Sequence, residues 1–464
     1  MTYTHYDRLT ALDASFLEME SRSVHMHVGS VSIFEPGPLG RPDGGVDFDR
    51  ICTIVEAGLR RAPRFRQKLV YTPGTRHPVW VDDPGFNLLY HLRHTALPPP
   101  GNERQLKRLA GRVMSQKLDR GKAMWVLWVV EGLEKGRFAL VSKVHHCLID
   151  GISGVALAGA YMGRDPDVRL QVSEARWVPR PAPSGTQLIA DDLMRRVTQP
   201  LSGLAKSATR PNRSMSSATR AVTGLREALG VALTPASETP FNLPIGPHRR
   251  FDWTRFDLAT VRGIKDNLGG KLNDVVLTCV TGAVRRFLQH RKVDVDDIDF
   301  RVFVPVSTRS DEERGKLGNR VSMIAASLPV GEKDIRRRYD AVVAETRHIK
   351  ESGQVEGTEV VEQLSDWTST TLLTQFSKLA ASRRSFNMVV TNVPGPAMAS
   401  YLDGARLLET YPLVPLFSNQ ALGIALLSYD GGLYWGFNAD WDALPDLHHF
   451  VEGLEEEFEI LRKL

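Results

Sequence analysis

Apolar and polar positions repeat with two different periods along the chain, so strands and helices are expected to alternate. A period of two is typical of a strand and a period of 3.6 of an amphipathic helix. The period-two pattern covers residues 24–35, 137–146 and 300–307, and residues 423–440 read as a β-hairpin that turns at Asp430-Gly431-Gly432. The helical pattern covers residues 48–62, 104–118, 154–162 and 273–288. These elements together predict a mixed α/β fold.

Start and stop signals fix the ends of two of these helices. Pro63 follows the helix over residues 48–62 and is expected to end it. Asn273 or Asp274 is expected to cap the helix over residues 273–288, because both side chains accept hydrogen bonds from backbone N–H groups at a helix start.

Length and composition narrow the class of protein. A chain of 464 residues is too long for one compact core, which predicts two subdomains. The three cysteines are Cys52, Cys147 and Cys279, too few and too far apart for a disulfide framework, and they fit a reducing compartment. The N-terminal residues do not read as a signal peptide, and the apolar run "AMWVLWVV" is far shorter than the roughly 20 residues of a membrane span. We therefore expect a soluble or peripheral protein.

The middle of the chain has a different composition. Residues 176–187 are rich in Pro, Ser and Gly, as in a linker. Leu193–Arg226 contains no acidic residue, has apolar residues between its charges, and carries seven basic ones: Arg195, Arg196, Lys206, Arg210, Arg213, Arg220 and Arg226. Such a segment is most often a solvated connector. The alternative is a basic amphipathic segment that contacts an anionic membrane. Nucleic acid is not an expected partner, because no binding motif accompanies the charge.

The stretch "VSKVHHCLIDGISG" (Val141–Gly154) carries the strongest candidate chemistry. In an extended strand, alternation places His146 on one face and His145 with Cys147 on the other. Asp150-Gly151 breaks the strand pattern, and a helix is expected to begin near Ile152. His146 is thus expected at a strand-to-helix junction, where functional groups are often exposed.

Several simpler interpretations of this stretch stay open on spacing alone. Asp150 can be an ordinary helix cap. His146 and Asp150 as metal ligands lack an evident third partner, so no metal is expected. A thiol dyad of Cys147 with His146 has poor geometry, because adjacent strand residues face apart. A plain structural turn is the remaining alternative.

A resemblance to a known family changes this balance. "HHCLIDG" resembles the HHxxxDG motif of the wax ester synthase/diacylglycerol acyltransferase family, which is similar to chloramphenicol-acetyltransferase-like enzymes and to peptide-synthetase condensation domains. Further stretches resemble family blocks in family order: "LTALDASFL", "RQKLV" with "PVWVDDPGFNLLYHLRH", "TPFNLPIGPHRRF", "LNDVVLT", "PVSTR", "LGNRVS" and "VVTNVPGP". The family often has Pro-Leu-Trp where this chain has Ala123-Met124-Trp125. Trp125 is kept, so the departure concerns local packing or acyl-chain preference.

The resemblance implies two chloramphenicol-acetyltransferase-like subdomains, each a mixed sheet flanked by helices, with an active-site tunnel between them. Residues 1–170 would form the subdomain with the motif, residues 171–240 the basic connector, and residues 241–464 the second subdomain. The implied reaction moves a fatty acyl group from acyl-coenzyme A, a co-substrate, to diacylglycerol or a fatty alcohol, with no cofactor. The implied location is the cytoplasm, in contact with the inner membrane face or lipid droplets.

Roles in that reaction follow for the motif residues. His146 is the expected general base, because an imidazole can take up a proton near neutral pH. No acyl-enzyme intermediate is expected, because both substrates would meet at one site. His145, Asp150 and Gly151 are expected to support the loop. The resemblance also implies an arginine partner for Asp150, and the sequence does not choose between Arg301 and Arg309.

The second half is expected to contribute the remaining site residues. The family's Asn-Asp pair implies that Asn273 donates to the oxyanion, with an ordinary helix cap as the alternative. Asp274 and Trp125 are expected to support the site. "TNVPGP" (Thr391–Pro396) is expected to line the acyl passage or to form a rigid turn.

Two other functional classes stay open at this point. A condensation-type enzyme would take acyl groups from a carrier protein and form an ester or an amide. A non-catalytic lipid-binding protein would have a decayed site, and the intact "HHCLIDG" counts against decay.

Overall fold

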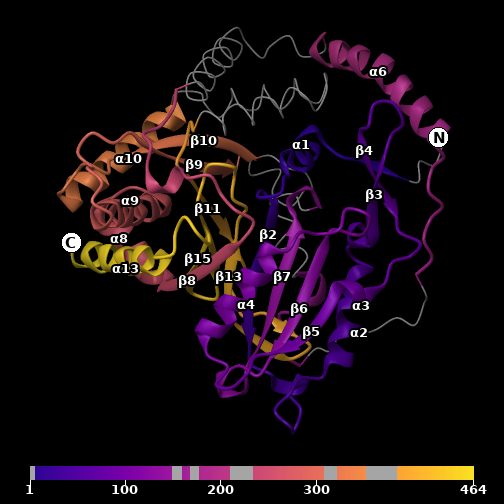
Figure 1. Ribbon diagram of the computed structural model, residues 1–464, viewed down its shortest axis with the longest axis horizontal. Helices are drawn as coiled ribbons and strands as arrows, with labels where there is room; N and C mark the ends of the chain where they lie inside the picture. The colour runs from indigo at the N-terminus through magenta and orange to yellow at the C-terminus, as the bar shows by residue number, and fades with distance from the viewer. Residues whose placement is uncertain (1–5, 149–158, 168–176, 209–233, 308–320, 352–383) are drawn as a thin grey trace.

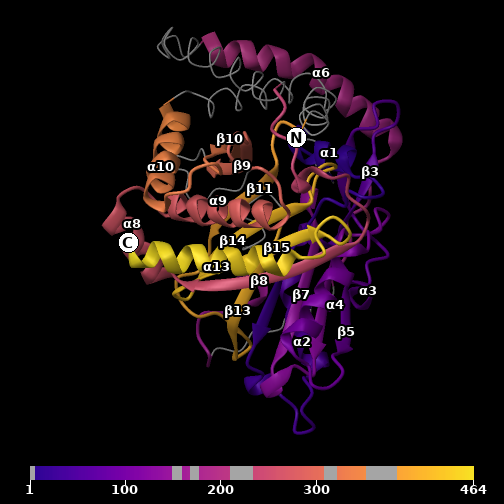
Figure 2. The ribbon, with the colours of Figure 1, turned by 60° about the vertical axis from the view of Figure 1, so that its left-hand side comes forward.

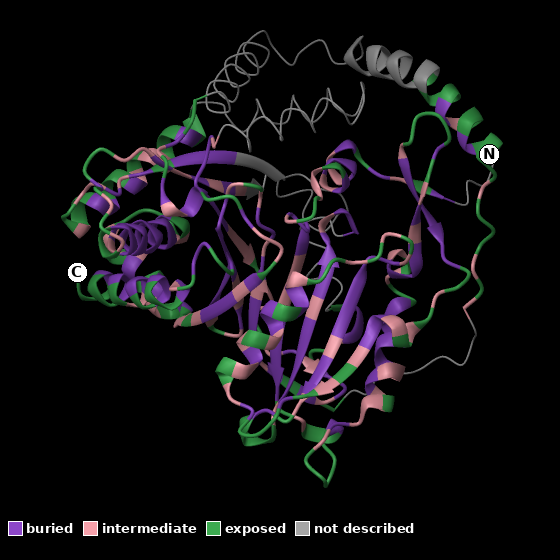
Figure 3. Cartoon of the chain, in the orientation of Figure 1, coloured by how far each residue is buried: buried purple, intermediate pink, exposed green. Residues whose placement is uncertain are grey.

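The computed structural model describes residues 6–148, 159–167, 177–208, 234–307, 321–351 and 384–464 (Figure 1). Two six-stranded sheets, each flanked by helices, form the two halves of the molecule. Buried residues follow the strands of both sheets (Figure 3). This confirms the predicted mixed α/β fold. The expected tunnel between the halves stays a prediction.

The first sheet has the strand order β12-β13-β2-β7-β6-β5. Its strands are β2 (His27–Phe34), β5 (Leu92–Ala96), β6 (Trp125–Glu131), β7 (Phe138–His145), β12 (Tyr401–Leu402) and β13 (Ala405–Leu413). Only β5 and β6 pair in parallel. The helices of this half are α1 (Ala11–Met19), α2 (Phe48–Leu59), α3 (Leu88–His91) and α4 (Glu103–Ser115). A small sheet has the order β1-β4-β3, with β1 (Asp7–Arg8), β4 (Pro78–Asp82) and β3 (Gln67–Tyr71).

The second sheet has the order β10-β9-β11-β14-β15-β8. Its strands are β8 (Arg249–Asp257), β9 (Phe300–Ser307), β10 (Val321–Leu328), β11 (Met388–Pro394), β14 (Leu422–Tyr429) and β15 (Gly432–Asp440). Among the described residues, four helices cover one of its faces (Figure 2): α8 (Leu258–Leu268), α9 (Leu272–His290), α10 (Ile335–Glu351) and α13 (Leu447–Lys463). Single 3-10 turns complete the described elements: η1 (Gly37–Leu39), η2 (Pro63–Arg66), η3 (Glu134–Gly136), η4 (His146–Leu148) and η5 (Pro240–Asn242).

The hairpin of β14 and β15 confirms a prediction from the turn chemistry. Tyr429 pairs with Gly432, so Asp430 and Gly431 form a two-residue loop. Both have positive φ, +41° and +79°, as this tight turn requires.

The start of α9 differs from the prediction. Lys271 occupies the cap position, so the expectation that Asn273 or Asp274 caps this helix is wrong. Asp274 lies one turn inside, where its Oδ2 accepts a hydrogen bond from the Lys271 backbone N at 2.7 Å. A carboxylate at the third helical position can accept a hydrogen bond from the backbone N–H of the cap residue, as in a capping box. The helix expected over residues 154–162 lies mostly outside the described residues.

The two halves exchange strands. β12 and β13 come late in the chain, yet β13 pairs antiparallel with β2 of the first sheet, from Leu407 opposite Phe34 to Leu413 opposite Gly29. The predicted division at residue 241 therefore follows chain order and does not separate the two sheets. The three predicted segments stay a prediction.

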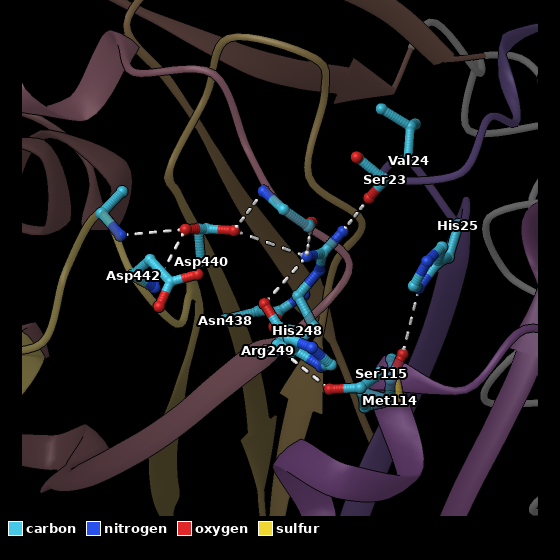
Figure 4. Close-up of polar contacts among 12 residues, drawn as sticks. Ser23, Val24, His25, Met114, Ser115, His248, Arg249, Asn438, Asp440 and Asp442 are labelled. Atoms are coloured by element: carbon cyan, nitrogen blue, oxygen red, sulfur yellow. Dashed lines mark hydrogen bonds and ion pairs between the residues drawn. The ribbon is translucent and has the colours of Figure 1, made fainter.

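A buried arginine joins the same two halves. Arg249, 4% exposed, begins β8, and its backbone N donates to Ser115 Oγ at the end of α4 at 2.8 Å. Its guanidinium donates to the carbonyl oxygens of Ser23 and Gly246 and lies 3.8 Å from Asp440 Oδ2 (Figure 4). One side chain thereby links the N-terminal segment to the edge of the second sheet.

Part of the predicted basic connector forms the helix α6 (Gly185–Ala208). Leu188 packs in a small core cluster with Tyr6, Val79 and Val81. The Tyr6 hydroxyl donates to Asp191 at 2.8 Å, and Arg8 pairs with Asp192 at 2.6 Å. The N-terminal part of α6 is thus attached to the first half, and residues 209–226 lie outside the described residues.

Candidate active site

The two histidines of the motif lie where β7 ends. β7 stops at His145, and His146 begins the 3-10 turn η4. The backbone N of His145 donates to Met124 O at 3.0 Å and that of His146 to Met26 O at 2.8 Å. The strand end is therefore fixed from both sides. Because alternation stops at His145, it does not decide where His146 points.

His146 combines partial exposure with a buried ring nitrogen. The residue is half-buried, and its ring centroid lies 4.0 Å from that of Phe16 in α1. Its Nδ1 is buried and forms no hydrogen bond to another described residue. Burial lowers the pKa of His146 to about 4. The imidazole is therefore neutral near pH 7 and can accept a proton. Ile152, near which a helix is expected to begin, lies outside the described residues.

His145 is buried and has a different environment. Its Nδ1 accepts a hydrogen bond from the Cys147 backbone N at 3.2 Å, so the ring proton is on Nε2. That Nε2 lies 3.7 Å from Glu20 Oε2. Burial, and then the positive charge of Arg120, lower the pKa of His145 to about 3. His145 is thus a neutral residue that holds the turn.

An ion cluster lies behind His145 and was not predicted from the sequence. The Glu20 side chain is 2% exposed and contacts Arg120 Nε at 2.6 Å and Lys117 Nζ at 2.8 Å. Arg120 also donates to the carbonyl oxygen of Leu17. Glu20 follows α1 directly and lies three residues after the block "LTALDASFL", but no feature of the sequence pairs it with His145.

Cys147 contacts a histidine, but not the expected catalytic one. Its Sγ lies 3.1 Å from His145 Nδ1, so the two residues that alternation assigns to one face do meet. Burial raises the pKa of Cys147 well above that of a free thiol. A protonated thiol is a poor nucleophile, and the contact instead stabilises the turn. In the part of the chain that is described, no three His, Cys, Asp or Glu side chains are arranged to hold a metal ion.

Trp125 begins β6 and pairs with Val144 of β7. Its indole Nε1 donates to Phe65 O at 2.7 Å, and its ring stacks on His91 with centroids 4.8 Å apart. Trp125 therefore fixes the strand next to the one that carries the histidines.

Asn273 and Asp274 have separate tasks at the start of α9. Asp274 is buried, and besides Lys271 N it accepts a hydrogen bond from Thr346 Oγ1 of α10 at 2.7 Å. Asn273 is exposed, and its Oδ1 accepts a hydrogen bond from Asn392 Nδ2 at 2.9 Å. The structure thus brings two sequence candidates together, the Asn-Asp pair and the segment Thr391–Pro396.

Three predicted residues, Asp150, Gly151 and Arg309, lie outside the described residues. Arg301, the other candidate partner of Asp150, pairs with Asp299 and donates to Thr234 O at 3.0 Å. The partner of Asp150 stays open. Among the described residues no hydrogen bond joins the histidines to Asn273.

The described arrangement supplies a neutral imidazole at a strand end and an exposed amide at a helix start. The first can remove a proton from a hydroxyl group, and the second can donate to a developing negative charge. None of the described helices is both long and apolar enough to span a membrane.

Comparisons with known proteins identify the family that this chain resembles. A family model for the wax ester synthase/diacylglycerol acyltransferase catalytic domain matches residues 9–276, and the model for the C-terminal domain of that family matches residues 317–462.

Two relatives from Mycobacterium tuberculosis (strain ATCC 25618 / H37Rv) cover nearly the whole chain. The probable diacylglycerol O-acyltransferase tgs1 is 31% identical over 97% of this chain and 94% of its own length. The corresponding protein tgs2 is 32% identical over 98% of this chain and 99% of its own.

Two solved structures extend the comparison. A wax ester synthase/diacylglycerol acyltransferase from Marinobacter aquaeolei VT8 superimposes with a TM-score of 0.70 and 25% identity, covering 99% of this chain and 100% of the other. The starter condensation domain of rhizomide synthetase superimposes with a TM-score of 0.59 and 12% identity over 99% and 94%, which shows a shared fold.

Proposed function

Because the chain belongs to the wax ester synthase/diacylglycerol acyltransferase family and is an acyltransferase, we propose that it transfers a fatty acyl group from acyl-coenzyme A to the hydroxyl of a lipid alcohol. The acceptor is diacylglycerol, a long-chain fatty alcohol, or both. Relatives that cover nearly the whole chain carry diacylglycerol O-acyltransferase names, which supports this substrate class over a carrier-bound acyl group.

The neutral, half-buried His146 is the observation that carries the proposal. An alcohol is a weak nucleophile, so a base must take its proton as the oxygen attacks the thioester carbonyl. The new C–O bond forms and the carbonyl electrons move to oxygen. When that intermediate collapses, the C–S bond breaks, and the imidazolium returns the proton to the coenzyme A thiolate. No net proton is gained or lost.

The oxyanion of that intermediate needs a hydrogen-bond donor, and we assign this role to Asn273. Its side chain is exposed at the first turn of α9, a 19-residue helix. The positive end of the helix dipole adds to the attraction for negative charge. Cys147 takes no part as a nucleophile, so the acyl group passes directly between the two substrates.

Because the acceptor is insoluble in water, we expect the protein to contact a lipid surface, and we propose that the helix α6 makes this contact. Ile189, Leu193 and Met194 are exposed apolar residues on this helix, at 47%, 64% and 66%. Arg195 lies next to them and is also exposed. Apolar side chains beside a basic segment are typical of helices that lie on anionic membranes or lipid droplets.

An acceptor panel tests the reaction. The purified protein is mixed with palmitoyl-coenzyme A and with dioleoylglycerol, hexadecanol or no acceptor, and release of free thiol is followed together with the lipid product. Thiol release that depends on an added alcohol and yields the matching ester supports the proposal. Activity only with carrier-bound acyl groups, or acceptor-independent thiol release, contradicts it.

A further inference from the structure

We propose that Asn392 is a positioning residue that turns the Asn273 amide so that its NH2 end faces the reacting acyl group. The inference rests on the proposed role of Asn273 as oxyanion donor. Asn392 Nδ2 donates to Asn273 Oδ1 at 2.9 Å. This contact joins the segment Thr391–Pro396 to the start of α9.

The two ends of an asparagine amide have nearly the same shape and opposite hydrogen-bonding character. Rotation by half a turn about the last side-chain bond exchanges a double donor for an acceptor. While the Asn392 NH2 group donates, this hydrogen bond occupies the Asn273 oxygen. In the reverse orientation two NH2 groups would face each other. The NH2 of Asn273 is thus the end that is directed away from Asn392.

The backbone that carries Asn273 is held firmly. Asp274, the next residue, accepts hydrogen bonds from Lys271 N and Thr346 Oγ1, both at 2.7 Å. A Cβ at Gly270 would lie 2.8 Å from Asp274 Oδ2, so only glycine leaves room for this carboxylate. With the helix start fixed, rotation about the side-chain bonds is the main freedom left to Asn273.

Asn392 lies where β11 can reach this helix start. Residues 389–394 of β11 pair with β14, whereas pairing with β9 covers only Met388 and Val389. Beyond Val389, no described strand pairs with that edge of β11. Met388 and Val390 pack in the same core cluster as the α9 residues, and alternation places Asn392 next on their face. Asn392 is therefore the polar residue at the point where the apolar contact between β11 and α9 ends.

A purely structural tie between α9 and β11 is the competing explanation, and one substitution separates the two. In Asn392→Asp the carboxylate cannot donate, so Asn273 is expected to turn its NH2 toward residue 392. The tie survives this change, because a carboxylate is a good acceptor. The end of Asn273 that faces the acyl group changes from donor to acceptor.

The experiment measures kcat and KM with palmitoyl-coenzyme A and dioleoylglycerol as substrates. The proteins compared are the parent, Asn273→Ala, Asn392→Ala, Asn392→Asp, and the double variant that combines Asn273→Ala with Asn392→Asp. Loss of one oxyanion donor costs roughly 100-fold in kcat, which is the loss expected for Asn273→Ala. Asn392→Asp is expected to lose at least as much, and Asn392→Ala clearly less, with KM and Tm near those of the parent. Asn267→Asp, an exposed asparagine of α8, adds the same charge as a control.

The outcomes distinguish the positioning role of Asn392 from the oxyanion role of Asn273. If Asn392→Asp acts through Asn273, adding it to Asn273→Ala costs nothing more, since the cycle is then fully coupled. An additive loss in the double variant, or full kcat in Asn392→Asp while Asn273→Ala is slow, overturns the positioning role alone. Full kcat in Asn273→Ala overturns the oxyanion assignment, and the inference with it.

Discussion

His146 has one buried ring nitrogen and a residue surface that is partly open, and these two properties set its acid–base behaviour. Burial removes water from the charged form, so the folded protein binds the imidazole proton less tightly than a free histidine, whose pKa is about 6.5. His146 should consequently remain neutral, and able to act as a base, at lower pH than a free histidine.

The pH profile of turnover tests this. The base must be neutral to act, and the pKa of His146 is lowered to about 4, so kcat should stay level from pH 8 to roughly 5 and then fall. An unperturbed histidine would already halve the rate near pH 6.5. Circular dichroism at each pH confirms that the protein is folded where rates are compared. A half-maximal rate near pH 6.5 in folded protein would contradict the assignment.

Substitutions separate the roles of the three neighbouring residues. His146→Ala should lower kcat by about 100- to 10,000-fold with an unchanged Tm, because a general base is lost. His145→Ala should lower kcat less and Tm more, since its ring holds the turn. Cys147→Ser should keep most of the activity. His348→Ala, an exposed histidine of α10, is the control. A full-rate His146→Ala variant, or an acyl group found on Cys147 by mass spectrometry, would overturn the mechanism.

At this scale the motif indicated a candidate base, whose role stays a prediction, but it did not indicate the surroundings of that residue. The HHxxxDG spacing is enough to single out His146, because the motif lies within seven consecutive residues. Glu20 and Arg120 could not be predicted, since they reach His145 only when α1 and the segment after α4 fold against the end of β7. Strand alternation failed at His146 for a local reason, the change from strand to 3-10 turn.

Several buried polar groups from β7, from β2 and from the segment before β2 lie at the C-terminal end of α4. Lys143 Nζ donates to Val113 O at 2.7 Å and to Gln116 O at 2.6 Å. His25 Nδ1 and His27 Nδ1 each lie 3.5 Å from Met114 O. These groups satisfy carbonyl oxygens that a helix end otherwise leaves unpaired.

Acid should weaken the fold through these histidines. Burial lowers the pKa of His25 and, more strongly, of His27, and lowers those of His145 and His146 to about 3 and about 4. Below pH 6.5 the unfolded chain binds protons that the folded one does not, so stability is present above that pH and is lost as pH falls toward 4. The slope is about 1.4 kcal/mol per pH unit for each such histidine.

Urea unfolding at pH 7.0 and 5.5 measures this effect. The free energy of unfolding should be lower at pH 5.5, and His27→Gln should reduce the difference between the two pH values relative to the parent. The exposed His348→Ala variant should leave that difference unchanged. Equal stability at both pH values would show that these histidines do not govern acid unfolding.

The exposed side of α6 is the element expected to meet lipid. The double variant Leu193→Glu with Met194→Glu should reduce flotation on anionic vesicles, because it places charge where apolar side chains would enter the interface. Neutralising the seven basic residues of Leu193–Arg226 should also reduce it, at about 1 kcal/mol for each residue near the surface. Ile460→Glu, at an exposed apolar position on α13, is the matched control. Flotation of both variants at the parent level would rule out this segment as the contact.

Arg249 acts at the scale of the whole molecule, because its contacts come from both halves. Arg249→Ala should lower the free energy of unfolding by about 3 to 5 kcal/mol, since it leaves the buried Asp440 without its positive partner and two carbonyl oxygens without a donor. Burial lowers the pKa of Arg249 to about 10, so the side chain stays charged at neutral pH. Urea unfolding compares it with Arg262→Ala, an exposed position on α8. A loss below 1 kcal/mol would show that the halves do not depend on this residue.

The family resemblance implied the two-sheet architecture, but nothing in the sequence indicated how the halves are joined. The period-two pattern made five strands recognisable: β2, β7, β9, β14 and β15. The pairing of β13 with β2 was not recognisable, because residues 405–413 carry no local mark of the sheet they enter. The contacts of Arg249 likewise depend on segments that are far apart in the chain.

The strand exchange also has a consequence for synthesis on the ribosome. β2 is synthesised long before its partner β13, because nearly all the other strands lie between them in the sequence. Until β13 is made, one edge of β2 offers unpaired backbone groups, the kind of edge to which a neighbouring chain can add. Synthesis of β13, rather than completion of the N-terminal strands of the first sheet, is therefore the step that ends this exposure.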